Sequence, residues 1–185
     1  MEWKKQLRSL EHAKKWDFAI ELMEDIIKKN PKDIEAYIFM NYLLMNLLVE
    51  ENCDRNKLDC YEVLAKKYFD ESAKFSNNAE YLYYTGMTAY MSEWYFGIDR
   101  KDADEMLEKA KFLDPNNLIY NFNYYWSLFK QNHQNQEAIA YAKMVLNENS
   151  PIQDILKGKG AVGTYLLEMM MYRSKQILEL QPYKE

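Results

Sequence analysis

A glycine-rich segment near the C-terminus carries a spacing that is typical of nucleotide binding. Residues 158–163 follow the pattern G-x-G-x-x-G, and Glu179 comes about twenty residues after the first glycine. The pattern binds a pyrophosphate when a strand precedes it and a helix follows it, because the turn then aims backbone N–H groups at the phosphates. Residues 151–156 make a poor strand, and no lysine follows the last glycine. We therefore expect a hinge into the last helix and keep a nucleotide-binding enzyme as an alternative.

The histidines and clustered carboxylates do not form the sets that acid–base or metal chemistry needs. His12 and His133 lie 121 residues apart and fit neither H-E-x-x-H nor a catalytic triad. Asp102, Asp104 and Glu105 lie where a helix is predicted to begin, and negative charge there is favourable to the helix dipole. We predict a protein without catalytic residues, metal site or cofactor.

The two cysteines and the apolar segments indicate a cytoplasmic protein. Cys53 and Cys60 are not a C-x-x-C pair and have no histidine beside them, so we expect reduced thiols. Residues 1–15 are charged and lack a signal-peptide run, so export is not expected. The most apolar stretch, residues 36–49, is shorter than the roughly 20 residues of a membrane span. We expect no membrane partner.

Composition favours a single helical domain over residues 1–185. Five glycines and four prolines are too few for a fold with many tight turns, which disfavours sandwiches and barrels. A 48% hydrophobic content with 15% aromatic residues is too rich for a disordered chain. A chain of this length also buries enough surface to fold without disulfides.

The charge distribution points to a protein partner with a basic surface. The net charge is -5, and residues 51–115 hold 9 basic and 14 acidic side chains. Nucleic-acid affinity comes largely from basic side chains, so direct nucleic-acid binding is disfavoured. The alternative is that the acidic side chains simply solvate outward helix faces.

Apolar residues recur at helical spacing along almost the whole chain, for example at Val63, Leu64 and Tyr68. Breaks of cap and stop residues separate the segments, such as Leu113-Asp114-Pro115. The pattern predicts helices over residues 2–14, 17–30, 33–50, 56–75, 78–92, 101–113, 117–131, 135–148 and 161–181.

The predicted hairpins repeat. A proline closes three segments, and in each an alanine lies about one helix length before it: Ala19 before Pro31, Ala103 before Pro115, and Ala138 before Pro151. Gly86 lies in the middle of another helix with Ala89 three positions on, which would let a second helix approach closely. A mid-helix glycine costs about 1 kcal/mol against alanine, so we expect a packing reason for it.

In these segments the chain resembles the tetratricopeptide repeat family. The resemblance rests on residues 16–36, 79–90, 103–115 and 138–151. Matching positions are Trp3, Ala19, Met23 and Pro31 in one repeat, and Gly86, Ala89, Ala103, Leu107, Ala110 and Pro115 in another. It implies an all-α fold of about four antiparallel helical hairpins over residues 1–150, closed by a C-terminal helix over 161–181.

The chain departs from the family pattern at several positions, which predicts an irregular, compact array. Leu7, Asn41 and Tyr125 stand where the family has a small glycine, and Ser76 replaces a closing proline. The lysine and asparagine side chains with which chaperone-binding members hold a terminal carboxylate are absent, so that function is disfavoured.

Three predicted helices share an apolar i, i+4, i+7 triplet. The triplets are Ile38, Tyr42 and Met45; Tyr83, Met87 and Tyr90; and Phe122, Trp126 and Phe129. In a stacked array they would line a concave groove that binds a protein segment. The alternative is that the chain fills this groove itself with the helix over residues 165–180, since an open apolar wall would threaten solubility.

The loop over residues 92–100 is a second candidate binding element. Trp94 and Phe96 flank a third aromatic residue within it, and the loop could bind a partner or tuck under the array as a plug. Asp99, Asp102 and Glu105 would add an acidic rim that speeds encounter with a basic surface.

Together these features predict a non-catalytic protein that binds another protein through the apolar groove, the acidic rim or both. Such a protein could be an immunity protein that neutralises a basic toxin, or a chaperone for a secreted client. The sequence gives neither the partner nor the oligomeric state.

Overall fold

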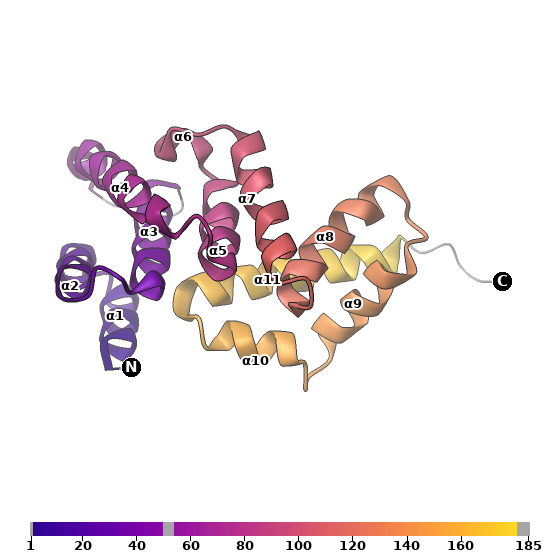
Figure 1. Cartoon of the computed structure of the whole chain (residues 1–185). Helices are drawn as coiled ribbons and strands as arrows, with labels where there is room; N and C mark the ends of the chain where they lie inside the picture. The colour runs from indigo at the N-terminus through magenta and orange to yellow at the C-terminus, as the bar shows by residue number, and fades with distance from the viewer. Residues whose placement is uncertain (1, 50–53, 181–185) are drawn as a thin grey trace. The chain divides into compact units, whose positions relative to one another are not determined.

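The protein is all-α in a computed structural model that describes residues 2–49 and 54–180. Every regular element within these ranges is a helix, so the predicted all-α class is confirmed. The tetratricopeptide-like arrangement of the hairpins stays a prediction. The chain divides into two compact units, Met1–Asp114 and Pro115–Glu185 (Figure 1). The division falls at the predicted break after Leu113. The expectation of one domain over 1–185 stays a prediction.

The first unit consists of helical hairpins (Figure 1). Its α-helices are α1 (Glu2–His12), α2 (Trp16–Lys29), α3 (Ile34–Val49), α4 (Leu58–Ser72), α5 (Ala79–Ala89), α6 (Glu93–Phe96) and α7 (Arg100–Leu113). Short 3-10 helices, η1 (Arg55–Lys57) and η2 (Ala73–Phe75), flank α4. Neighbours in sequence pack together from α1 to α4, while α3 also contacts α5, α5 pairs with α7, and α6 lies against α4.

Helices α3 and α5 form the core of the first unit. Apolar residues occur on all sides of α3, which is typical of a helix that is buried all round. Every residue from Tyr81 to Ala89 on α5 is buried. The outer helices α4 and α7 bury only one face each.

Small residues lie at the close helix contacts, as the sequence predicts. Ala19, Ala103 and Ala138 are all buried. A Cβ atom added to Gly86 on α5 would lie 3.1 Å from Cβ of Met106 and 3.2 Å from Cδ2 of Leu107, both on α7. Gly86 therefore has the packing role that was expected of it.

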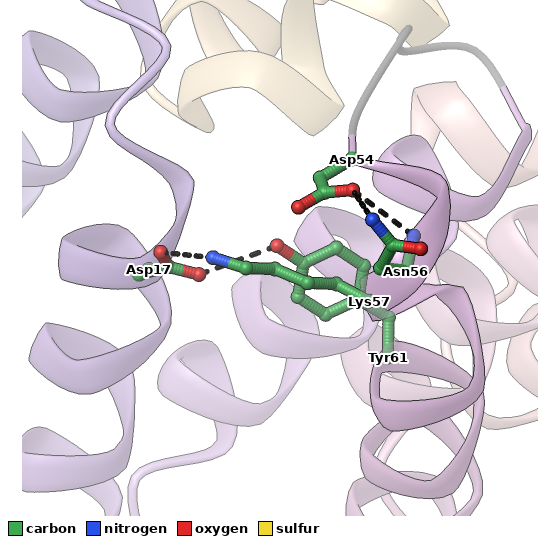
Figure 2. A network of polar contacts seen from close by, with 5 residues as sticks. All are labelled: Asp17, Asp54, Asn56, Lys57 and Tyr61. Atoms are coloured by element: carbon green, nitrogen blue, oxygen red, sulfur yellow. Dashed lines mark hydrogen bonds and ion pairs between the residues drawn. The ribbon is translucent and has the colours of Figure 1, made fainter.

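Side-chain hydrogen bonds fix α4 on α2 (Figure 2). The Lys57 ammonium lies 2.5 Å from Oδ2 of Asp17, and the Tyr61 hydroxyl donates to Oδ1 of Asp17 at 3.3 Å. Asp54 caps η1, accepting from the backbone N–H and side-chain amide of Asn56 at 3.0 Å each. The hydrogen bond with Asp17 raises the pKa of Lys57. This network positions the start of α4.

Two more contacts of the same kind hold the rest of α4. The Tyr68 hydroxyl donates to Oε1 of Glu24 on α2 at 2.9 Å, and burial together with this carboxylate raises the pKa of Tyr68. On α3, the Asn41 side-chain amide donates to the Ser72 hydroxyl at 3.2 Å. One face of α4, with Tyr61, Tyr68 and Ser72, thus contacts α2 and α3.

The second unit contains α8 (Leu118–Gln131), α9 (Gln136–Leu146), α10 (Pro151–Lys157) and α11 (Gly160–Glu179). Helix α11 packs against each of the other three. One core cluster of this unit is Phe129, Ala138, Ile139, Ala142 and Ile177, with Tyr125, Trp126 and Leu178 packed against it.

Asparagine side chains cap three of the predicted helices at their first residues. Asn78, Asn117 and Asn135 each accept a hydrogen bond from a backbone N–H of the helix that follows. Such caps satisfy N–H groups that have no partner within the helix. Two short helices, α6 and α10, were not predicted; α10 begins with Ser150-Pro151, and proline favours the first helical position.

Candidate functional site

The three apolar triplets lie in the interior rather than on an exposed wall. All of their side chains are buried except Tyr90 and Trp126, which are half-buried. In the third triplet, Phe129 belongs to the same core cluster as Ile177 of α11. This burial favours the alternative that the chain packs these side chains itself. Binding of a partner by these residues stays a prediction, and the exposed chemistry lies elsewhere.

Each of the two half-buried triplet members, Tyr90 and Trp126, has an arginine of the same chain over its ring. The Arg100 guanidinium lies 3.9 Å from the centre of the Tyr90 ring and donates a hydrogen bond to the Tyr90 hydroxyl. Arg173 lies 5.5 Å from the Trp126 ring centre and donates to Oδ1 of Asn123 at 3.0 Å. Cation–π contacts of this kind stabilise the fold locally.

In the segment over residues 92–100, which was predicted either to bind a partner or to act as a plug, Phe96 and Trp94 differ in exposure. Phe96 is 1% exposed, and its ring packs 4.9 Å from that of Phe69 on α4, so it is the plug. Trp94 is 61% exposed. Of the two predicted aromatic residues, only Trp94 is available to a partner.

Trp94 lies in a groove between α4 and α6, which we call the α4–α6 groove. Its lining residues are Asp59, Glu62, Val63, Lys66, Trp94, Tyr95 and Gly97. The four on α4 are spaced i, i+3, i+4 and i+7, so they share one helix face. This face is opposite to the face of α4 on which Tyr61 and Tyr68 contact α2.

The apolar part of the groove is highly exposed. Val63 is 69% exposed, and the Trp94 and Tyr95 rings lie 5.6 Å apart at an angle of 49°. Val63 is one of the apolar residues that recur at helical spacing in this segment, yet it lies outside the buried stripe. The buried stripe is Tyr61, Ala65, Tyr68 and Ser72, and this period places Val63 outside. That period is the sequence signal that could have found this face.

The charged part of the groove is acidic. Among the residues that the structure describes (2–49 and 54–180), none forms an ion pair with Asp59 or Glu62. Lys66 is the basic residue of the lining, and its ammonium lies 3.4 Å from Oδ2 of Asp70 one turn further along α4. The groove therefore presents two carboxylates that form no ion pair in the described ranges, against the single ammonium of Lys66.

Gly97 lets the chain leave α6 beside this groove. Its φ of +69° lies in the left-handed region, where glycine is favoured. A Cβ atom there would lie 3.3 Å from Nζ of Lys66. The turn thus holds Trp94 and Tyr95 close to α4.

The predicted acidic rim has local partners. Asp99 and Asp102 form a capping box: Asp99 Oδ1 accepts from the N–H of Asp102 at 2.9 Å, and Asp102 Oδ2 accepts from the N–H of Asp99 at 2.8 Å. Glu105 lies 3.3 Å from the Lys101 ammonium. These side chains begin and stabilise α7, and their part in steering a partner stays a prediction.

The glycine pattern has a packing explanation. Helix α10 precedes it where a nucleotide site needs a strand. A Cβ atom on Gly163 would lie 1.9 Å from the carbonyl oxygen of Leu156, so α11 passes directly against the end of α10. The residues of the pattern thus join two helices.

The other chemically capable residues are dispersed. Cys60 is exposed on α4, and Cys53 lies outside the described residues. Within the ranges that the structure describes, no group of three or more His, Cys, Asp or Glu side chains could hold a metal ion. Among the helices described, none has both the length and the apolar content needed to cross a bilayer.

Comparison of the chain with protein-family models, with curated proteins and with solved structures found no match.

Proposed function

We propose that this protein binds another protein through the α4–α6 groove and performs no catalysis. The observation that supports this most is the exposure of Trp94 and Val63 in one groove. Tryptophan is among the residues that most often dominate the energy of protein interfaces, and truncating such an anchor costs 2 kcal/mol or more in typical cases.

The surroundings of Trp94 suit an anchor of this kind. The α4 side of the groove is held by the Asp17 and Glu24 contacts with Tyr61 and Tyr68. The α6 side is held by Phe96 against Phe69. A partner would therefore meet a preformed surface, which lowers the entropy that binding must overcome.

The helical-hairpin architecture is consistent with a binding role. Stacked hairpins of the tetratricopeptide type, which the sequence resembles, present rigid surfaces to protein partners. In this proposal the buried triplets supply the rigidity and the α4–α6 groove supplies the contact.

A capture experiment with matched surface variants tests the proposal. The tagged full chain is used to isolate partners from cells that express it naturally, and mass spectrometry quantifies them. We expect Trp94→Ala combined with Val63→Ser to lose a partner that the unaltered chain retains. Phe112→Ala is the control, because Phe112 is 83% exposed on α7 and does not line the groove.

Circular dichroism checks that the helices persist in each variant. Equal capture by all three proteins would contradict the proposal, as would equal loss in the groove variant and the Phe112 control.

A further inference from the structure

We infer that the α4–α6 groove receives a cationic side chain, an arginine or a lysine, from a basic segment of the protein partner. This inference rests on the proposed function, since it names the chemistry of the partner at that site. Three features of the groove carry it: its aromatic surface, its carboxylates and its size.

The aromatic surface is suited to a cation. The face of an indole ring attracts ammonium and guanidinium groups, and tryptophan does so most strongly. Elsewhere the chain uses this contact itself, with Arg100 over Tyr90 at 3.9 Å and Lys74 over Tyr37 at 4.4 Å. In the described ranges no lysine or arginine lies over Trp94.

The carboxylates discriminate between classes of partner. A purely apolar side chain in the groove would take Asp59 and Glu62 partly out of water without a partner, which is unfavourable. An acidic side chain would add repulsion. A cation is attracted by both carboxylates, and the ammonium of Lys66 lies 3.4 Å from Asp70 rather than within ion-pair distance of Asp59 or Glu62.

The groove has room for one long side chain. Its volume is about 310 Å³, at the small end of the range for ligand pockets. Arginine fits the arrangement best, because its planar guanidinium can stack on an indole ring while it donates hydrogen bonds to a carboxylate. We expect arginine to bind more tightly than lysine.

The inference can be tested on the full chain with two small probes. N-acetyl-arginine amide and N-acetyl-citrulline amide have similar shape, but only the arginine compound is charged. The signal is the indole N–H resonance of Trp94 in a two-dimensional ¹⁵N spectrum, identified by its loss in Trp94→Phe. We expect a saturable shift with the arginine probe at millimolar concentrations and a much smaller shift with the citrulline probe.

Removing the carboxylates should weaken binding of the arginine probe. Asp59→Asn and Glu62→Gln should each raise its dissociation constant about two- to fivefold, as for exposed ion pairs. The control is Glu108→Gln, which removes an exposed carboxylate of α7 that does not line the groove. Added salt should weaken the arginine probe further.

Each outcome decides the question. Equal shifts with both probes, no shift with either, or equal effects of Glu62→Gln and Glu108→Gln would overturn the inference. If capture of a partner depends on Trp94 and Val63 while the arginine probe fails, the proposed function stands and the cationic occupant is wrong. If the arginine probe binds while Trp94→Ala with Val63→Ser captures partners as the unaltered chain does, the groove binds cations but is not the partner site.

Discussion

Of Gly86, Gly97, Gly158 and Gly163, Gly163 is the glycine at which an added Cβ atom would meet the nearest obstacle. Its hypothetical Cβ would lie 1.9 Å from a backbone oxygen of α10 and 2.7 Å from Cβ of Lys159. Because the nearest obstacle is backbone, no rotation of a side chain can relieve it. The glycine that looked like part of a nucleotide loop therefore has a structural reason to be glycine.

We predict that Gly163→Ala destabilises the protein by about 1–3 kcal/mol, as overpacking does. Gly158→Ala is the matched control, since the nearest atom to a Cβ there is 3.3 Å away and its φ is -74°. Urea unfolding of the two variants measures the difference. A cost for Gly158→Ala equal to that for Gly163→Ala would contradict the packing explanation.

Glu11 on α1 gives a prediction for pH. Burial raises the pKa of Glu11 to about 7 from its ordinary 4.5, against the opposing effect of Arg8. In the unfolded chain Glu11 loses its proton near pH 4.5, whereas in the folded chain it keeps the proton until about pH 7. Its contribution to stability is therefore full below pH 4.5 and is lost as the pH rises to 7.

Replacing this carboxyl with an amide should remove that loss. We predict that Glu11→Gln gains about 1–3 kcal/mol relative to the unaltered chain between pH 4 and pH 8. Urea unfolding of both proteins at the two pH values gives the comparison. A stability difference that does not change with pH would show that Glu11 titrates normally in the folded protein.

At the scale of elements, the attachment of α4 determines where the groove lies. Asp17 on α2 accepts from both Lys57 and Tyr61, so one carboxylate ties η1 and α4 to the second helix (Figure 2). Its pairing with Lys57 is exposed to water, and such pairs contribute little to stability.

We predict that Asp17→Asn causes a small loss of thermal stability that shrinks as salt is added, because the Lys57 pairing is exposed. A double-mutant cycle with Lys57→Met isolates the ionic part from the hydrogen bond of Tyr61. Thermal melts at low and high salt supply the data. A loss that is independent of both salt and Lys57 would assign the contribution to Tyr61 alone.

The helical period and the cap residues were enough to predict most elements from the sequence. They placed the long helices within a few residues and identified Ala19, Ala103 and Gly86 as close-packing positions. They missed α6 and α10, which are too short to show a period. They also failed to separate buried from exposed faces, because α3 and α5 are apolar all round and their triplets look the same in either setting.

The site was only partly predictable for the same reason. Trp94 and Phe96 stood out together because three consecutive aromatic residues lie in the predicted loop over residues 92–100, although only Trp94 of the two is exposed. Asp59, Glu62 and Val63 were not identified, since their proximity to Trp94 depends on how α6 folds back onto α4. Such a contact between separate segments has no local sequence signal.

At the scale of the whole molecule, the excess of acidic side chains and the α4–α6 groove lie in the same unit of the chain. Residues 51–115 carry the excess of acidic side chains, and the α4–α6 groove lies within the same stretch. The acidic field and the groove would therefore act on the same partner, one on the rate of encounter and the other on the lifetime of the complex.

We predict that association with the captured partner slows as ionic strength rises, by roughly tenfold or more between low and high salt. Stopped-flow or surface-based kinetics at several salt concentrations measure this rate. An association rate that salt does not change would remove electrostatic steering from the proposal while leaving the groove contact to be judged separately.

The central claim is that a partner contacts the protein at the α4–α6 groove, and cross-linking from within the groove tests it most directly. A photoreactive phenylalanine analogue is placed at position 63 in one protein and at position 112 in another, and both are irradiated in cells that express the protein naturally. The account predicts a discrete adduct from position 63 that disappears with Trp94→Ala and is absent from position 112. Adducts that are the same from both positions, or that persist without Trp94, would contradict it.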